Sequence, residues 1–247
     1  MNGVVVVTGG SRGIGAAVVR RAAAAGRSVC FSYRTEVSAA RDVAEEVRRT
    51  GGHAHPVKAD MSVEGDIVQL FAAAAELGPV TGLVANAGIG AEKRRLDEFD
   101  VDRVRQLLEV NVLAPILCCR EAVRRLSTRH GGQGGSIVLV SSAASRIGSP
   151  GEYIDYAATK GAVDTLGQGL AKEVAGEGIR VNVVRPGIID TGFHASGGQP
   201  DRVQRLSSTL PLSRAGTADE VAAAILWLLS DEASYCTGSI LDVAGGR

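Results

Sequence analysis

The residue types best suited to chemistry lie between Ser142 and Lys160. Tyr156 and Lys160 are four positions apart at the start of a run without proline whose apolar positions fit a helix, so both side chains lie on one helix face. A tyrosine hydroxyl ordinarily titrates near pH ~10, and a neighbouring ammonium lowers that pKa. The pair can therefore act as a tuned acid/base, with an ordinary helix surface as the alternative. Ser142 ends an apolar strand, where its hydroxyl could hold a substrate oxygen.

The composition favours a protein with a sizeable core. The chain has 247 residues, 45% of them hydrophobic and 4% aromatic, which suits one large α/β domain or two small ones. Basic and acidic residues both number 27, so charge does not indicate nucleic acid or an anionic membrane as a partner. The 4 cysteines lack the spacing of metal ligands, and we expect free thiols in a reducing cytoplasm. We expect neither a signal segment nor a membrane span.

A glycine-rich turn lies near the start of the chain. Val4–Val7 is a β-branched run typical of a buried parallel strand, and the alanine-rich residues 16–25 predict a helix. Between them, residues 8–15 read Thr-Gly-Gly-Ser-Arg-Gly-Ile-Gly. Glycines let the backbone approach a pyrophosphate, and a helix N-terminus favours its negative charge. The stretch predicts a dinucleotide-binding loop, with a plain structural turn as the alternative.

The end of the second predicted strand, residues 28–33, bears on the choice of cofactor. An acidic residue there would hydrogen-bond the ribose 2′-hydroxyl of NAD, but the strand ends in Tyr33 and Arg34. A guanidinium attracts the 2′-phosphate of NADP, and Arg12 in the glycine-rich turn could reach the same phosphate. We therefore predict NADP rather than NAD, unless both arginines are simply solvated.

The remaining chain alternates strands and helices. Strands are predicted at 53–59, 82–88, 136–141, 179–184 and 239–243, and helices at 36–50, 64–77, 99–127 and 217–229. Such regular alternation predicts a doubly wound parallel sheet. Asn111 lies inside the long helix with Pro115 after it, which predicts a kink. Asp60 and Met61 follow the third strand, where they could touch an adenine ring, although Asp60 could equally cap the next helix.

These motifs follow one another in an order that resembles the short-chain dehydrogenase/reductase family. The matching features are the glycine-rich motif at 8–15, Asn86-Ala87-Gly88, Asn111, Ser142, the pair Tyr156-x3-Lys160 and Pro186-Gly187. The resemblance is to the single-domain branch and covers essentially the whole chain, down to the closing Asp-Val-Ala-Gly-Gly at 242–246. It implies an oxidoreductase that moves a hydride between a nicotinamide cofactor and a carbonyl or alcohol.

The resemblance also implies catalytic roles. Tyr156 would donate the proton to the carbonyl oxygen in reduction and remove it in oxidation, while Lys160 would lower the Tyr156 pKa and bind the nicotinamide ribose. Ser142 would hydrogen-bond the reacting oxygen, and it is preferred to Ser141 and Ser145 because the family serine is usually second in such a pair. Asn111 would support a proton relay through water. Preorganised donors of this kind suit an alkoxide that develops during the reaction.

Further contacts are implied by the same resemblance. The residues expected to contact the cofactor are Gly9, Ser11, Arg12, Gly13, Ile14, Gly15, Tyr33, Arg34, Asp60, Met61, Asn86, Ala87, Gly88, Tyr156, Lys160, Pro186, Gly187, Ile189 and Thr191. Residues 192–213 would form a mobile substrate lid, with a passive surface loop as the alternative. Tyr153 and His194 are candidate substrate contacts, and a solvated position is the alternative for His194.

We therefore expect one three-layer α/β domain over residues 1–247, a doubly wound Rossmann fold with a seven-stranded parallel sheet in the order 3-2-1-4-5-6-7. The expected function is that of a cytoplasmic NADP-dependent carbonyl reductase or alcohol dehydrogenase that acts on a small molecule without a metal. A homotetramer is the family default. One alternative is a 3-oxoacyl-carrier-protein reductase, for which the arginines near 120–129 could supply a basic docking patch. Another is a non-catalytic NADP-binding sensor or scaffold.

Overall fold

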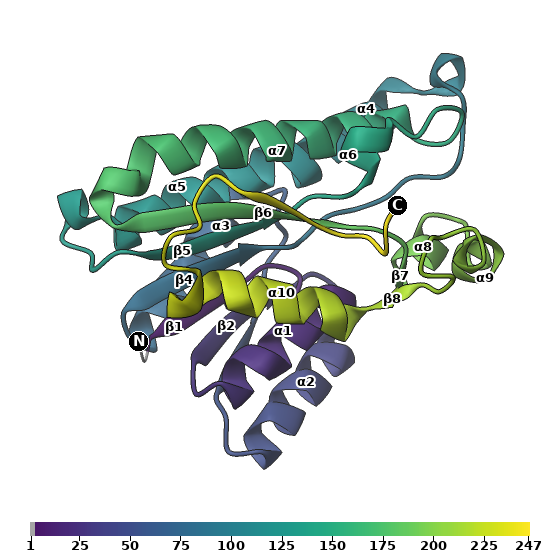
Figure 1. The fold of residues 1–247 in the computed structure, drawn as a ribbon. Coiled ribbons are helices and arrows are strands. Elements are labelled where there is room, and N and C mark those ends of the chain that lie inside the picture. The colour runs from purple at the N-terminus through teal and green to yellow at the C-terminus, as the bar shows by residue number, and fades with distance from the viewer. Residues whose placement is uncertain (1–2) are drawn as a thin grey trace.

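Seven parallel strands form a central sheet in the order β3-β2-β1-β4-β5-β6-β9 (Figure 1). The structure is a computed structural model that describes residues 3–247. The strands are β1 (Val4–Val7), β2 (Ser28–Tyr33), β3 (Ala54–Lys58), β4 (Val80–Ala85), β5 (Gly135–Val140), β6 (Ile179–Pro186) and β9 (Ile240–Val243). Strand β9 corresponds to the seventh strand predicted from the sequence, at residues 239–243. The observed order therefore confirms the predicted order 3-2-1-4-5-6-7.

Helices cover both faces of this sheet (Figure 1). One face packs against α1 (Gly13–Ala24), α2 (Val37–Arg49) and α10 (Ala218–Leu229). The other packs against α3 (Glu64–Glu76), α5 (Ala114–Leu126) and α7 (Ile154–Val174), and α4 (Val101–Leu108) lies beyond them beside α7. The chain therefore has the three layers that the sequence predicts.

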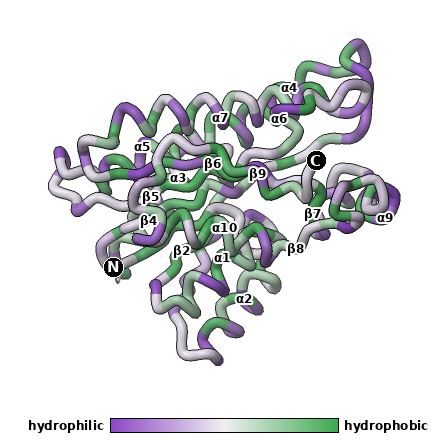
Figure 2. Tube along the Cα trace, viewed as in Figure 1, coloured by the Kyte–Doolittle hydropathy of each residue, from purple (hydrophilic) through white to green (hydrophobic). Residues whose placement is uncertain are grey.

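The all-valine strand β1 shows why the sheet is buried on both sides. Val4 and Val6 belong to the apolar cluster under α3, α5 and α7, whereas Val5 and Val7 belong to the cluster under α1, α2 and α10. Successive side chains of a strand point to opposite faces, so a strand between two helix layers must be apolar throughout. Figure 2 shows the same pattern as hydrophobic strands between helices with hydrophilic outer faces.

The mainly helical stretch predicted over residues 99–127 is present, and it changes form at the place where a kink is predicted. A π-helical segment, Glu109–Leu113, lies there between α4 and α5. Pro115 has no N–H to donate to the carbonyl of Asn111, so the regular hydrogen-bond ladder cannot continue there. The N–H of Ala114 instead donates to the carbonyl of Glu109, five residues back.

A second, two-stranded sheet was not expected from the sequence. The parallel strands β7 (Ile189–Asp190) and β8 (Gly216–Thr217) lie at the two ends of residues 192–213. Between them are α8 (Phe193–Ser196) and α9 (Arg202–Ser207), which project beside the sheet in Figure 1. The segment expected to be irregular thus contains two short helices and is closed at its base by strand pairing.

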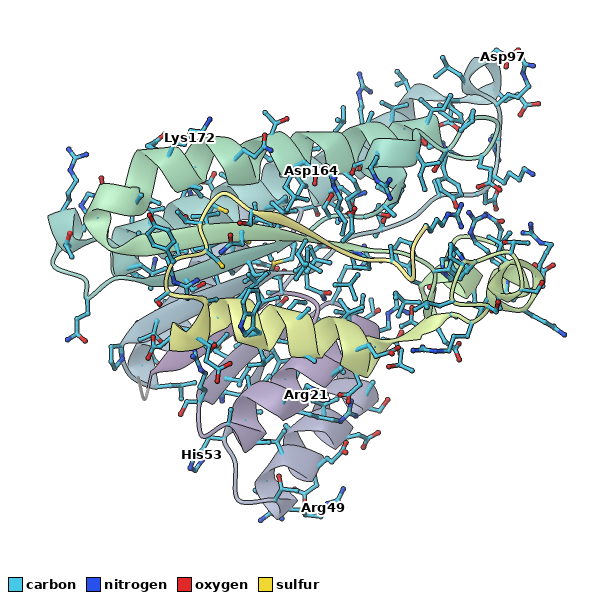
Figure 3. The ribbon with its side chains drawn as sticks, viewed as in Figure 1. Arg21, Arg49, His53, Asp97, Asp164 and Lys172 are labelled. Atoms are coloured by element: carbon cyan, nitrogen blue, oxygen red, sulfur yellow. The ribbon has the colours of Figure 1, made fainter. Side chains whose placement is uncertain are left out.

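The remaining elements are short. They are α6 (Ala144–Ile147) and the 3-10 turns Leu96–Glu98, Thr128–His130, Ala175–Glu177 and Asp231–Ala233. A capping box begins α10: Thr217 Oγ1 accepts from the N–H of Glu220 at 3.1 Å, and the Glu220 carboxylate accepts from the N–H of Thr217 at 2.8 Å. Arg21, labelled in Figure 3, pairs with Asp219 and joins α1 to α10. Within residues 3–247, every helix is too short or too polar to cross a bilayer.

Candidate active site

A continuous cleft runs along the carboxyl ends of the parallel strands. Its walls include Gly9 after β1, Arg34 after β2, Asn86 after β4, Ser142 after β5 and Gly187 after β6. In an open α/β sheet, these strand ends are where ligands bind. The cleft brings together the cofactor and substrate residues predicted from the sequence, with the exception of Gly15; of the predicted catalytic residues, Asn111 also lies outside the lining.

The glycine-rich turn is shaped by steric limits. Gly9 and Gly13 have φ values of 68° and 54°, which side chains rarely adopt. A Cβ on Gly15 would lie 2.1 Å from the carbonyl oxygen of Gly9, so Gly15 lets the first turn of α1 pack under the loop. This position explains why Gly15 supports the cleft instead of lining it.

Ser32, on β2, fixes the same turn from below and was missed in the sequence. Its hydroxyl accepts a hydrogen bond from the N–H of Gly9 at 3.0 Å, and its carbonyl accepts one from the N–H of Gly10 at 2.9 Å. A polar residue inside a strand that is otherwise apolar was the available signal. The N-cap residue of α1 is Arg12, which gives no side-chain cap, and the first turn has no acidic residue. The helix N-terminus therefore faces the cleft with N–H groups suited to an anion.

The strand end Asn86-Ala87-Gly88 is tied to the glycine-rich turn. Thr8 Oγ1 accepts from the N–H groups of Asn86 and Ala87 at 3.0 and 2.9 Å. The Asn86 amide in turn donates to the carbonyls of Thr8 and Gly9 at 2.9 and 3.2 Å. These bonds hold two strand ends at one fixed separation, so Thr8 and Asn86 shape the cleft through the backbone.

One end of the cleft has both basic and acidic side chains. Arg12 and Arg34 are exposed there, and neither takes part in an ion pair within residues 3–247. Burial raises the pKa of Asp60, but two hydrogen bonds from Ser62 and the charge of Arg34 outweigh that effect and bring the pKa below its usual value. The Asp60 carboxylate accepts from the Ser62 N–H and hydroxyl at 3.0 and 2.8 Å, so it closes the turn before α3 as well as lining the cleft.

At the other end, Ser142 and Tyr156 face each other. Ser142 is brought by the end of β5 and Tyr156 by the first turn of α7, and both line the same end of the cleft. Burial raises the Tyr156 pKa to about 12, and the nearby Ser142 hydroxyl opposes this only in part. Ser141 is occupied elsewhere, since its hydroxyl donates to the carbonyl of Lys160 at 3.0 Å. Ser145 donates to the carbonyl of Ser142 at 2.8 Å.

The expected lowering of the Tyr156 pKa by Lys160 is wrong for this structure. The Lys160 ammonium donates to the carbonyl of Val140 at 2.9 Å and lies 5.8 Å from the centroid of the Tyr156 ring. Burial lowers the pKa of Lys160 itself to about 8, against the opposing charge of Asp164. In this arrangement Tyr156 is a neutral hydroxyl at pH 7, which is the form that can donate a proton.

Asn111 holds the loop after β4 against α7. Its Oδ1 accepts from the N–H of Ile89 at 2.9 Å, and its Nδ2 donates to the carbonyl of Ile89 at 2.9 Å and to Thr159 Oγ1 at 3.2 Å. The side chain is buried and its hydrogen-bonding atoms are all used. Asn111 therefore acts here as a positioning residue, and the water relay stays a prediction.

Two aromatic residues pack against the Tyr156 ring. The Tyr153 ring lies edge-on to the Tyr156 ring at 5.9 Å, and Phe193 from α8 lies at 5.8 Å on a tilted plane. His194 also lines the cleft, and burial together with Arg202 and Arg247 lowers its pKa. Sequence reasoning missed Phe193 and both arginines, because nothing in their spacing ties them to Tyr156.

The segment after β6 closes the cleft. Gly187 donates its N–H to the carbonyl of Val243 at 3.0 Å, and a Cβ there would lie 2.7 Å from Ala244 Cα. Thr191 lies over the glycine-rich turn, within 3.5 Å of where a Cβ on Gly13 would be. Across residues 3–247, no group of three or more His, Cys, Asp and Glu side chains is placed to hold a metal ion.

Comparison with known proteins identifies relatives of this chain. Residues 9–247 match a family model described as "Enoyl-(Acyl carrier protein) reductase". The chain is 51% identical to the uncharacterized oxidoreductase YgfF of Escherichia coli, over 99% of both chains, and 37% identical to a 3beta-hydroxysteroid dehydrogenase of Eggerthella lenta, over 98% of this chain and 92% of that one.

A solved structure supports the same assignment. A blue fluorescent protein from a metagenomic library, in complex with NADPH, superposes with a TM-score of 0.89 at 33% identity and covers 99% of this chain and 97% of its own. The fold, the ordered motifs and these relatives agree: the chain belongs to the short-chain dehydrogenase/reductase family of oxidoreductases.

Proposed function

We propose that this protein is an NADP-dependent oxidoreductase that transfers a hydride between the nicotinamide and a carbonyl or alcohol. The observation that carries the proposal is the placement of two kinds of group along one cleft. An uncapped helix N-terminus lies at one end, with two arginines that have no acidic partner within residues 3–247, and Ser142 lies beside Tyr156 at the other end. A dinucleotide is the ligand class that has its phosphates and its reactive ring at two separate places.

The residues at the first end fit a dinucleotide phosphate group. The backbone of Gly9 to Ile14 would bind the pyrophosphate, with charge complementarity from the start of α1. Arg12 and Arg34 would bind a 2′-phosphate, and their lack of acidic partners within residues 3–247 leaves their charge available. The NADPH complex of the blue fluorescent protein supports this cofactor class.

At the second end, the chain's own residues handle the proton. The cofactor, when bound, supplies or accepts the hydride. In reduction the neutral Tyr156 hydroxyl donates its proton to the carbonyl oxygen while Ser142 donates a hydrogen bond to the same oxygen. Lys160, held by Val140 and with a pKa near neutrality, would bind the nicotinamide ribose and restore the proton. Asn111 would keep the neighbouring loop in place for this transfer.

The test is calorimetric titration of the protein with NADPH and NADH at one salt concentration, followed by a panel of ketones and aldehydes with NADPH. Preferential NADPH binding with turnover of at least one carbonyl is the expected result. Preference for NADH would overturn the assignment of Arg12 and Arg34, and binding of neither nucleotide would overturn the whole proposal.

The carrier-protein alternative finds little support in the charges. Arg120, Arg124 and Arg125 all pair with the buried Glu121, at 3.2, 2.8 and 2.8 Å. Arg129 pairs with Glu177 at 3.2 Å. Arg120 also pairs with Glu64 at 2.6 Å, so three carboxylates offset most of the charge of these four arginines, which makes a weak docking patch for an acidic carrier protein. The same experiment distinguishes the proposed enzyme from a non-catalytic sensor or scaffold, because a sensor or scaffold would bind NADPH but would reduce no carbonyl compound of the panel.

We further propose that residues 192–213 act as the substrate lid of a cytoplasmic homotetramer. The lid carries Phe193 and His194 into the cleft, which supports its role over substrate. Several large apolar side chains on the α4–α5 surface are exposed, among them Leu108, Leu113 and Ile116 at 48%, 46% and 42%. Exposed large apolar side chains on one pair of helices suit a subunit interface. Light scattering would contradict the tetramer if it gave the monomer mass of 25.5 kDa.

A further inference from the structure

The substrate end of the cleft has an uneven distribution of charge. The acidic residues that line the cleft, Glu36 and Asp60, are both at the nucleotide end. Beside Tyr156 the lining instead includes Arg202 and Arg247, which come from α9 and from the end of the chain. The proposed reaction does not use either of these two arginines.

Arg202 is a buried cation whose hydrogen bonds are incomplete. Only 2% of the residue is exposed. Its two terminal nitrogens donate to the carboxylate of Glu152 at 3.1 and 2.8 Å, and one of them also donates to Gln199 at 2.9 Å. Its Nε, in contrast, is buried and has no hydrogen-bond partner within residues 3–247. The guanidinium also lies 5.0 Å from the centre of the Tyr153 ring.

This geometry leaves one donor of Arg202 without an acceptor beside the cleft. Glu152 holds the outer fork of the guanidinium but is absent from the cleft lining, whereas Arg202 and Gln199 are part of it. A buried N–H on a charged group is destabilising unless an acceptor reaches it. The best acceptor is an anionic oxygen, because hydrogen bonds between two charged groups are the strongest kind.

Arg247 adds a second guanidinium at the same place. Its side chain takes part in no ion pair within residues 3–247. Its main-chain oxygen accepts a hydrogen bond from Arg146 in α6, which ties residue 247 to the wall of the cleft. Arg247 is close enough to oppose the burial that raises the pKa of Tyr153 and to lower the pKa of His194. Two guanidinium groups therefore lie close to Tyr153 and His194 at this end of the cleft.

We propose that the substrate carries a carboxylate group, bound by Arg202 Nε and Arg247, at a fixed distance from the carbonyl or hydroxyl that reacts at Tyr156. The inference rests on the proposed oxidoreductase function and names its substrate class as oxo acids and the matching hydroxy acids. Two-point binding would place the reacting carbon with one face toward the cofactor. Charge on the substrate would also help draw it into this end of the cleft, whose lining within residues 3–247 has arginines but no acidic residue.

The test compares pairs of compounds that differ only in charge. The probes are levulinate, 3-oxocyclohexanecarboxylate and 4-oxocyclohexanecarboxylate, each with its methyl ester. Binding is first measured by calorimetry to the protein saturated with NADP⁺, which cannot reduce a ketone, so binding is read without turnover. Turnover of the same six compounds with NADPH follows as a separate measurement.

We expect at least one acid to bind roughly 10- to 100-fold more tightly than its ester, the range of one charge-assisted hydrogen bond. Arg247→Gln should remove most of that preference and leave ester binding unchanged, while Arg247→Lys should retain it. Arg95→Gln is the matched control, since Arg95 pairs with Asp97 on an exposed loop outside the cleft lining. Arg202→Gln should act like Arg247→Gln, and its fold is checked by circular dichroism because it also releases Glu152.

The two proposals fail in different ways. If no acid binds better than its ester, or if Arg247→Gln leaves the preference intact, the carboxylate site is refuted even when uncharged ketones are turned over. If an acid binds selectively through Arg247 but no compound oxidises NADPH, the carboxylate site stands as a binding site and the proposed reaction is refuted.

Discussion

The two ends of the cleft are built in different ways. The nucleotide end is assembled mainly from β1, the turn after it, α1 and the end of β2, which are neighbours in sequence. The substrate end joins Ser142 and Tyr153 with α8, α9 and Arg247, and it is held by contacts such as Arg202–Glu152 that bridge 50 residues. The first end is made of backbone geometry, and the second of side chains that meet only in the folded chain.

This difference separates what is general from what is specific. Backbone N–H groups and glycines recognise a phosphate whatever else the ligand carries. Side chains from residues 192–213 and from the end of the chain can change without disturbing the sheet, so we expect substrate specificity to depend on this less constrained part of the fold. The comparison predicts that changes at the two ends affect different measurable quantities.

The largest expected effect is at the substrate end, in Tyr156→Phe. Removal of the hydroxyl should lower kcat by ~10²- to 10⁴-fold, the range for a general acid, because no other donor replaces its proton. NADPH affinity should stay near the wild-type value. The measurements are steady-state kinetics and calorimetry. Tyr235→Phe is the control, since Tyr235 is fully exposed and outside the cleft. Retained turnover in Tyr156→Phe would exclude the acid role.

Lys160→Met tests the buried ammonium between the two ends. Burial lowers the Lys160 pKa from 10.5 to about 8, so between these values the unfolded chain binds more protons than the folded one, and stability rises with pH. From pH 8 to pH 10 the wild type should gain about 2 kcal/mol in unfolding free energy relative to Lys160→Met. Denaturant unfolding at several pH values measures this gain.

The control for that gain is Lys172→Met, on the exposed side of the same helix, as Figure 3 shows. It should follow the wild type at every pH. A Lys160→Met difference that does not change with pH would show that the ammonium is not destabilised by burial. Lys160→Ala should also weaken both NADPH binding and turnover, and unchanged values for both would contradict the role of Lys160 at the ribose.

Gly15→Ala addresses the backbone that forms the nucleotide end. A methyl group 2.1 Å from the Gly9 carbonyl must displace the loop, at a cost of roughly 1–3 kcal/mol in unfolding free energy and with loss of NADPH affinity. Gly169→Ala in α7 is the matched control, because nothing lies within 4 Å of its added methyl group. That control should stabilise the helix by about 1 kcal/mol. The measurement is thermal unfolding of both variants with and without NADPH. If Gly15→Ala were as stable as Gly169→Ala and gained as much from NADPH, the loop would tolerate a side chain at position 15 and the steric argument would be wrong.

Arg34→Ala should have the smallest and most selective effect. NADPH affinity should fall by about tenfold or more, since one charge-assisted hydrogen bond to the 2′-phosphate is lost, while NADH affinity should hold. Arg49→Ala, at the far end of α2 (Figure 3), is the control. Calorimetric titration with both nucleotides decides the matter: equal losses for NADPH and NADH would remove the 2′-phosphate assignment.

Much of the fold could be predicted because its signals are local. The run Val4–Val7, the glycines that follow it and the periodic helices each encode one element, and short parallel connections then fix the strand order. The break in the helix around Asn111 was indicated by Pro115, although its π-helical form was not. The pairing of β7 with β8 was missed, because two-residue strands leave no pattern in the sequence.

The sequence by itself determined the sheet, the phosphate-binding turn and the helical spacing of Tyr156 and Lys160, since each depends on residues a few positions apart. Only the tertiary structure decided the protonation of that pair, because burial, which raises the pKa of Tyr156 and lowers that of Lys160, depends on the layers packed around α7. It also decided the meeting of Arg202 and Arg247 beside Tyr156. Their sequence spacing carries no trace of it, because α9 and the chain end are brought to the cleft by long-range packing.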